Sequence, residues 1–222
     1  MTERRPRLRG RPTNGSSEQT RRRILDGARR VFSSQGYSRA TMRAIAAEAD
    51  VTAKAVYKYS PSKAALFVAV WEDAIEQIYA DYEHVVAAQG SLLGEVEALL
   101  DRSRQLLVER PDHTRLSLRV LLDHEHPDLV GADLQPRAAL EFYRNLAARG
   151  VQRGEITDLN REHVVVFIVT LLWGIMTLGA FDPATLDQSV AAAKWAARRQ
   201  LQPVTTPIEA LTREALTPGG RT

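Results

Sequence analysis

The 222-residue sequence contains no cysteine, which excludes disulfide scaffolds, cysteine nucleophiles and thiolate zinc sites and fits a reducing compartment. It also lacks a phosphate-binding glycine loop ending in Lys-Ser/Thr, a Gly-x-Ser-x-Gly nucleophile elbow and a His-Glu-x-x-His zinc pair. The arginine-rich first residues are followed by no apolar stretch, so no secretory signal is visible. We expect a cytoplasmic protein that is not an enzyme and holds no metal or cofactor. An enzyme built without these motifs is the main alternative.

Charge is distributed unevenly along the chain. The whole sequence carries 30 basic and 27 acidic side chains, but residues 1–63 hold 15 basic and 5 acidic ones, net +10, which leaves −7 for the rest. This asymmetry indicates an N-terminal part that meets a polyanion such as DNA. Arginine outnumbers lysine 26 to 4, so genome composition is an alternative explanation for the use of arginine rather than lysine. Genome composition does not explain why the basic side chains are concentrated in residues 1–63. A purely catalytic protein has no need of such a concentration.

Hydrophobic spacing predicts helices throughout, and no segment alternates with the period of two that strands require. Two short helices are expected after a first helix that Gly36 can end; Thr41 and Thr52 are good N-caps for them, and only residues 50–52 separate them. Pro61 stops the second short helix and opens a long amphipathic one that reaches about residue 88. The first helix has one apolar face, formed by Ile24, Leu25, Ala28, Val31 and Phe32.

The sequence therefore predicts an all-α protein in four segments. Residues 1–15 are rich in Arg, Pro and Gly and form a disordered basic arm. Residues 16–64 form a three-helix domain with a helix-turn-helix, residues 65–202 form a second helical domain, and residues 203–222 form a loose tail.

The second short helix, residues 52–59, has the composition of a DNA-reading helix. It can bury Val56 while small, basic and aromatic side chains face outward. Lys54 can donate to guanine or to phosphate, and tyrosine hydroxyls can donate to phosphate oxygens. Thr41 and Lys63 lie at two helix N-termini, where backbone N–H groups attract phosphate. A short helix of this composition is also often a solvated surface.

A specific set of residues occurs in order between positions 20 and 70: Gly36-Tyr37, Thr41, Ile45-Ala46, Ala49, Val51-Thr52 and residues 57–63. With this pattern, residues 20–70 resemble the DNA-binding domain of the tetracycline-repressor (TetR) family, and the rest of the chain matches the family's plan of a variable helical domain. The resemblance implies a homodimeric transcription repressor that a small molecule releases from a palindromic DNA operator. Asp50 stands where the family commonly has Gly, and we expect it to keep the turn because Asp tolerates positive φ. Ser60 stands where the family usually has an aromatic residue, so a core contact is lost there.

The resemblance also assigns roles to individual residues. Phosphate contacts are expected from Thr41, Tyr59 and Lys63, and a phosphate or thymine-methyl contact from Tyr57. Bases are expected to meet Thr52, Lys54 and Ala55. Lys58 can take either role, and Arg43 can reach the edge of the groove.

The basic arm contains Arg9-Gly10-Arg11-Pro12, which resembles the core of an AT-hook. In such motifs extended arginines lie in the narrow, strongly negative minor groove of A·T-rich DNA. Arg9 and Arg11 would then bind DNA beside the recognition helix. A nonspecific basic tail is the alternative.

Residues 164–181 are 18 residues without a charge, and as a helix they would span roughly 27 Å, the short limit for a membrane core. A membrane-tethered DNA binder is therefore an alternative. The soluble explanation is a helix buried partly in its own core and partly in a dimer. In the family the last two helices of each subunit form a four-helix dimer interface, which here implies residues of about 161–180 and 184–201. Small residues near Trp195 would allow close approach there: Ala191, Ala192 and Ala196.

An effector pocket is the least determined feature. Apolar side chains at helical spacing are usually ordinary core, so each candidate has that alternative. The run Asp123–His126 with Asp128 contains metal-capable ligands, but neighbours in one surface turn rarely converge on one ion. The candidate lining residues are Tyr79, Leu122, Phe142, Trp173 and Met176.

Overall fold

The computed structural model describes residues 14–134 and 137–201, and the predicted arm and tail lie largely outside them. Within these ranges all regular secondary structure is helical, with nine α-helices and three short 3₁₀ helices, which confirms the predicted all-α class. The described residues pack as two units. The first contains residues up to 74 together with 112–134, and the second contains residues 75–111 and 137–201.

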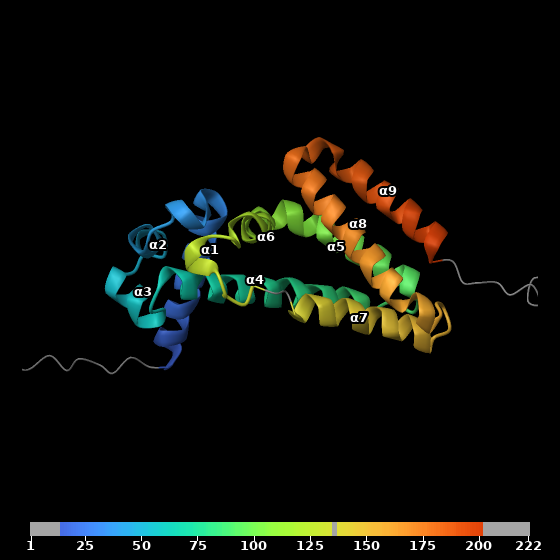
Figure 1. Ribbon diagram of the computed structural model, residues 1–222, viewed down its shortest axis with the longest axis horizontal. Coiled ribbons are helices and arrows are strands. Elements are labelled where there is room, and N and C mark those ends of the chain that lie inside the picture. The colour runs from blue at the N-terminus through green and yellow to red at the C-terminus, as the bar shows by residue number, and fades with distance from the viewer. Residues whose placement is uncertain (1–13, 135–136, 202–222) are drawn as a thin grey trace, which may run out of the picture. The chain divides into compact units, whose positions relative to one another are not determined.

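The N-terminal unit is built around the predicted helix-turn-helix, which Figure 1 shows as α1, α2 and α3 grouped around the start of α4. Gly36 interrupts α1 with a φ of 75°, as expected of a glycine at the end of a helical run, and a final turn follows it. The helices of this unit are α1 (Asn14–Arg39), α2 (Met42–Glu48), α3 (Ala53–Tyr59), the first half of α4 (Lys63–Val86), α6 (Pro111–Asp123) and η1 (Pro127–Leu129).

The predicted apolar face of α1 is buried in this unit, with 0–4% of each side chain exposed. Three aromatic rings extend that core. Phe67 of α4 meets Phe32 edge-on at 5.0 Å and Tyr37 at 5.3 Å. Fixing these rings holds the end of α1 against the start of α4, which gives the two short helices a rigid base.

Residues 112–134 pack with the N-terminal unit, whereas the sequence analysis placed residues 65–202 in one domain. Arg29 donates to Asp112 at 2.8 Å, and Asp123 accepts from the backbone N–H of Tyr37 at 2.9 Å. Trp71 donates to the carbonyl of Leu134 at 3.1 Å. These contacts join residues more than 60 positions apart, so spacing along the sequence could not reveal them.

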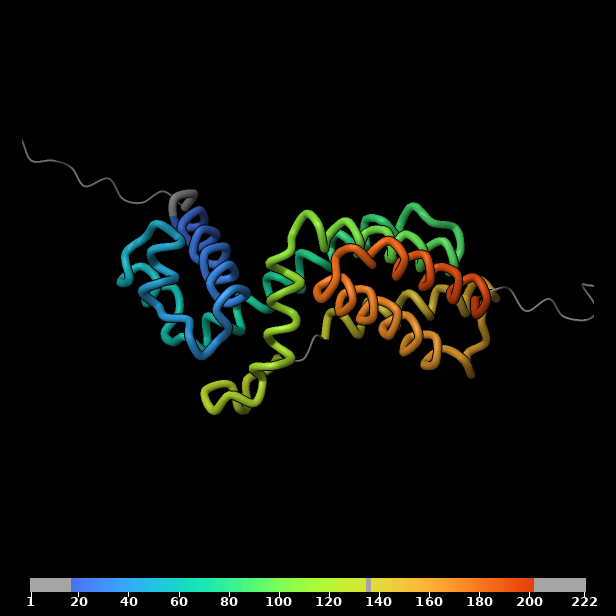
Figure 2. Tube along the Cα trace, turned by 90° about the horizontal axis from the view of Figure 1, so that it is seen from above, coloured from blue at the N-terminus to red at the C-terminus, as the bar shows by residue number. Residues whose placement is uncertain are grey.

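The C-terminal unit is a helical bundle around one apolar core. In Figure 2 its last two helices, in orange and red, lie side by side, and the structure packs them against each other and both against α5. The observed bounds of α8 and α9 agree closely with the expected pair. The helices of this unit are the rest of α4, α5 (Leu92–Glu109), α7 (Arg137–Gln152), η2 (Asp158–Asn160), α8 (Arg161–Phe181), η3 (Pro183–Thr185) and α9 (Leu186–Gln200).

Helix α8 buries one face and exposes another that is also apolar. By length and composition the segment Asp158–Phe181 is apolar enough to cross a membrane, yet only 33% of its apolar window is buried inside the chain. Val166, Trp173 and Phe181 lie on the outward face at spacings of seven and eight residues and are 64%, 39% and 84% exposed. Exposed apolar side chains gathered on one helix face are typical of surfaces that bind a partner.

Candidate nucleic-acid interface

Both short helices begin at the threonines that the sequence predicts as caps. The hydroxyl of Thr41 accepts from the backbone N–H of Ala44 at 3.1 Å, and that of Thr52 accepts from Ala55 at 3.2 Å. Each cap satisfies one of the N–H groups that a helix start leaves unpaired. Both threonine side chains remain exposed, so each hydroxyl still has its proton to donate outward.

The turn between α2 and α3 has the predicted geometry. Asp50 has a φ of 51° and is the only non-glycine residue with positive φ in the described part of the chain. The other departure from the family pattern is also accommodated, because Ser60 is buried and its hydroxyl donates to the carbonyl of Ser62 at 3.2 Å. The buried serine therefore replaces the expected aromatic contact with a local hydrogen bond.

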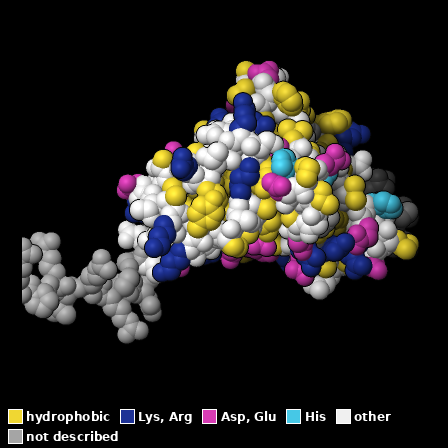
Figure 3. Space-filling model, turned by 60° about the vertical axis from the view of Figure 1, so that its left-hand side comes forward, with side chains coloured by type: hydrophobic (Ala, Val, Ile, Leu, Met, Phe, Trp, Pro, Cys, Tyr) yellow, Lys and Arg dark blue, Asp and Glu magenta, His cyan; other side chains and the backbone are white. Residues whose placement is uncertain are grey.

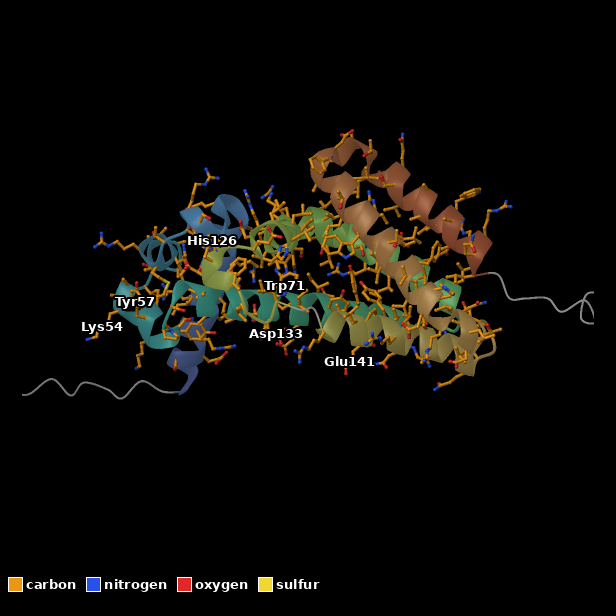
Figure 4. All side chains as sticks on the ribbon, viewed as in Figure 1. Lys54, Tyr57, Trp71, His126, Asp133 and Glu141 are labelled. Carbon is orange, nitrogen blue, oxygen red and sulfur yellow. The ribbon has the colours of Figure 1, made fainter. Side chains whose placement is uncertain are left out.

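Helix α3 presents a basic and aromatic outer face. Val56 is fully buried and anchors the helix, while Lys54 and Lys58 are exposed and Tyr57 is 55% exposed. In Figure 4 the labelled Lys54 extends away from the other helices of the unit. Ala55 is half-buried at the N-terminal end of α3, where a small side chain keeps the backbone accessible.

The arginines of α1 and the cations of α2 and α3 differ in whether they form ion pairs. Five arginines of α1 are paired with carboxylates within the unit. Among the described residues, Arg43, Lys54 and Lys58 contact no carboxylate, and all three side chains are exposed. Figure 3 turns this unit toward the viewer and shows Lys and Arg side chains spaced over a largely uncharged surface. The five paired arginines are Arg21, Arg22, Arg23, Arg29 and Arg30.

Two of the expected phosphate contacts are placed differently from the rest. The ammonium of Lys63 donates to the carbonyls of Tyr37 and Ala40 at 3.0 and 3.3 Å and lies 4.2 Å from the Tyr37 ring centre. It therefore closes the end of α1 rather than extending outward. Tyr59 is half-buried, and the Arg21 guanidinium lies 5.9 Å from its ring centre. Arg9 and Arg11 lie outside the described residues.

Tyr37 connects α1 to residues 123–128, a role that its place in the sequence does not indicate. Its hydroxyl donates to Asp128 at 3.3 Å, and its ring meets His126 edge-on at 4.7 Å. Burial and the Asp128 carboxylate raise the pKa of Tyr37 to about 12. Asp123 and Asp128, considered above as metal ligands, here hold Tyr37, and the described residues contain no cluster of three such groups placed to bind a metal ion.

The candidate effector residues fall in different places. Tyr79 and Phe142 meet at 5.3 Å in the C-terminal unit. Leu122 lies in the N-terminal unit and is 71% exposed. Trp173 is on the outer face of α8, and Met176 of the same helix is half-buried.

An aromatic cluster surrounds Tyr79 and Phe142. The hydroxyl of Tyr79 donates to that of Tyr143 at 2.9 Å. Tyr82 shares a hydrogen bond of 2.7 Å with Ser103, which itself donates to the carbonyl of Leu99. Burial raises the pKa of all three tyrosine hydroxyls, so they stay protonated and act as neutral hydrogen-bonding groups in an apolar core.

Comparison with known proteins agrees with this geometry. Residues 24–70 match the family described as bacterial regulatory proteins, tetR family. The transcriptional regulator AcrR of Shigella flexneri is 42% identical over 200 residues, covering 84% of this chain and 90% of that protein. The transcriptional repressor KstR of Mycolicibacterium smegmatis is 28% identical over 162 residues, covering 71% of this chain and 74% of that one.

Solved structures show the same fold over most of the chain. A TetR transcriptional regulator from Chloroflexus aurantiacus superimposes with a TM-score of 0.69 at 18% identity, covering 86% of this chain and all of that one. The fatty acid degradation regulator FadR of Bacillus halodurans gives a TM-score of 0.65 at 16% identity, covering 87% of this chain and 98% of that one.

Proposed function

The chain belongs to the TetR family of DNA-binding transcriptional regulators, and we propose that it acts as a homodimeric repressor that a small-molecule effector releases from a palindromic operator. The family is not enzymatic, which confirms the expectation that this protein is not an enzyme. DNA and a second copy of the chain are then its macromolecular partners. We place it in the cytoplasm, where its DNA target lies.

The observation that carries DNA binding is the set of unpaired cations on α2 and α3. Arg43, Lys54 and Lys58 have no carboxylate nearby in the described structure, so DNA phosphates or bases are their available partners. Helix α3 enters the major groove in this proposal, with Thr52 and Lys54 toward the bases. Thr41 and Tyr57 hold the flanking phosphates. The ammonium of Lys63 is assigned to α1 instead.

The exposed apolar face of α8 supports the dimer. Trp195 on α9 is 63% exposed, and Ala191 and Ala192 beside it are exposed and small enough for close approach. Two such helix pairs related by a twofold axis cover one another's apolar faces. The same burial explains a long apolar helix without a membrane. Two copies of α3 would then read half-sites about 34–36 Å apart or a multiple of that.

The aromatic cluster in the C-terminal unit supports effector binding. Tyr79 and Phe142 are the candidates that lie together there, among neutral hydroxyl groups. Helix α4 contributes residues to both the DNA-binding unit and this one, so a shift of α4 changes the packing in both units. The effector acts by preferring the conformation that fits DNA less well, with a coupling of typically 1–3 kcal/mol. The arm, with Arg9 and Arg11, adds minor-groove contacts in this proposal.

Selection of DNA by the purified protein tests this function. Genomic fragments that the protein retains at about 150 mM salt, where nonspecific binding is weakened, are sequenced. A pseudo-palindrome shared by the retained fragments supports the proposal, and its neighbouring genes suggest effectors to try. No enrichment by an intact dimer free of carried-over ligand would refute sequence-specific binding.

A further inference from the structure

One face of α1 contacts the end of α2 and the turn that follows it. Arg23, Gly27 and Arg30 are spaced by about one helical turn and so lie on the same face. They contact the three consecutive residues 50, 49 and 48 in that order. Residues 48–50 therefore follow α1 in the opposite chain direction, and the first of the three α1 residues contacts Asp50, which has positive φ.

The contacts of Gly27 with Ala49 and of Arg30 with Glu48 bring the turn close to α1. A methyl group at Gly27 would lie 2.9 Å from both the Cβ and the backbone nitrogen of Ala49, so only glycine permits this approach. Arg30 donates to the carboxylate of Glu48 at 2.6 Å. The backbone at the end of α2 therefore lies directly against α1, within reach of the guanidinium one turn earlier.

Arg23 contacts Asp50, the residue whose backbone conformation sets the direction in which the chain leaves the turn. Asp50 has a φ of 51°, a conformation that costs a side-chain-bearing residue more than glycine. Arg23 donates to the backbone carbonyl of Asp50 and also to its carboxylate at 2.6 Å. A single guanidinium thus binds both the backbone and the side chain of the strained residue. Gly at position 50 would offer no carboxylate to this arginine.

We propose that Arg23 is a positioning residue for DNA recognition, which fixes the backbone of Asp50 and so the angle at which α3 leaves the turn. This rests on the proposed insertion of α3 into the major groove. Asp50 supplies both the required turn and the group by which α1 holds it. The pair acts on the placement of α3 and touches no base itself.

The exposure of the pair separates this role from a general stabilising one. The Asp50 side chain is 99% exposed and that of Arg23 is 43% exposed, and such surface ion pairs add little to global stability. Losing the contact should therefore change how well α3 fits a specific sequence, while the unfolding midpoint in urea stays close to the wild-type value.

The test combines Arg23→Met and Asp50→Gly, singly and together, in the full-length protein. Arg22→Met is the matched control, because it removes the same charge from the same turn of α1 while Arg22 pairs with Asp73 of α4 instead. The probes are the duplex that the wild-type protein selects from a random library and a scrambled duplex of equal composition. Amide hydrogen exchange at Val51, whose N–H bonds to the carbonyl of Ala46 at 2.9 Å, reports on the turn without DNA.

We expect Arg23→Met to weaken binding to the selected duplex by about threefold to tenfold and to leave the scrambled duplex unchanged. We also expect faster exchange at Val51. Both effects should be smaller when Asp50 is already glycine, because glycine adopts the turn unaided and leaves Arg23 only the backbone carbonyl to bind. Arg22→Met should change neither measurement.

Two results would overturn the proposal. Equal weakening on both duplexes in both backgrounds, with the salt slope reduced by about one unit per arginine, would make Arg23 a phosphate contact. Unchanged exchange at Val51 in Arg23→Met would show that the arginine does not hold the turn. If the wild-type protein selects no duplex, sequence-specific binding fails, and the exchange measurement still decides whether Arg23 fixes Asp50.

Discussion

Replacing Lys54 and Lys58 by glutamine tests whether the unpaired cations of α3 are the ones that meet DNA. Each lysine that neutralises a phosphate releases counterions, and binding then weakens with salt by about 0.9 log units of affinity per log unit of salt for each contact. The double variant removes two lysines per subunit and four per proposed dimer. If all four contact phosphate, the slope should fall by about 3 to 4 units.

The matched control removes the same number of charges from paired positions. Arg21 is bonded to Glu18 at 3.1 Å and Arg22 to Asp73 at 3.2 Å, so their charges are already balanced within the protein. Replacing both by glutamine should change the slope by less than about one unit.

The assay is fluorescence anisotropy with a selected duplex from about 50 to about 200 mM salt, a range over which a multi-contact protein loses orders of magnitude in affinity. Circular dichroism and size-exclusion chromatography check that each variant is folded and keeps its oligomeric state. Equal flattening of the slope in both double variants would refute the argument, because pairing would then not predict which cations meet DNA. An unchanged slope in the lysine variant would show that neither lysine of α3 neutralises a phosphate.

Three further changes have expected outcomes. Asp112→Asn should destabilise the protein by about 1–2 kcal/mol at neutral pH in urea unfolding, because the mostly buried Arg29 loses one carboxylate partner. Trp195→Glu should give monomers by analytical ultracentrifugation because it places a charge in the proposed dimer interface, whereas Val130→Glu, at a 73% exposed site in the N-terminal unit, should leave dimers. Deleting residues 1–15 should lower the salt slope, because the arm carries five arginines.

The first of these also predicts a pH dependence. Burial acts to raise the pKa of Asp112, but the hydrogen bond and charge of Arg29 outweigh it and hold the pKa below its ordinary value. The pair therefore stabilises the fold above the unfolded pKa of about 4, and this stabilisation is lost as the pH falls through the lower folded value. The difference between Asp112→Asn and wild type should shrink below about pH 4. A stability difference between Asp112→Asn and wild type that is constant with pH would show that charge is not its cause. Dimers of Trp195→Glu would disprove the proposed interface. An unchanged salt slope after deletion of residues 1–15 would show that the arm does not contact DNA.

Local signals predicted the helix caps, and the family resemblance predicted the turn and the last two helices. Thr41 and Thr52 were identifiable as caps because each needs only its own hydroxyl and the next three residues. Positive φ at Asp50 was expected from the resemblance, because the family commonly has Gly at that position and Asp tolerates this conformation. The approximate bounds of α8 and α9 came from the resemblance to the family, whose last two helices form the dimer interface, and they agree closely with the observed helices.

Features that depend on distant partners were not predictable from spacing. Lys63 lies at the start of α4, where a sequence argument assigns it to phosphate, yet its ammonium is held by the carbonyls of Tyr37 and Ala40. Tyr37 in turn is held by Asp123 and Asp128, about 90 residues later in the sequence. No periodicity connects such positions, so only the folded chain shows that residues 112–134 support the DNA-binding unit.

The basic N-terminal segment shows why net charge alone cannot locate an interface. Ten of its cations lie in the described residues; five arginines of α1 are paired with carboxylates, and Arg39 and Lys63 donate to backbone carbonyls. The three that remain all lie on α2 and α3. The same ten cations in another arrangement would give the same pI and the same net charge without any group free to meet a phosphate. The placement of the acidic residues against α1 therefore does as much to define the DNA-facing surface as the placement of the basic residues themselves.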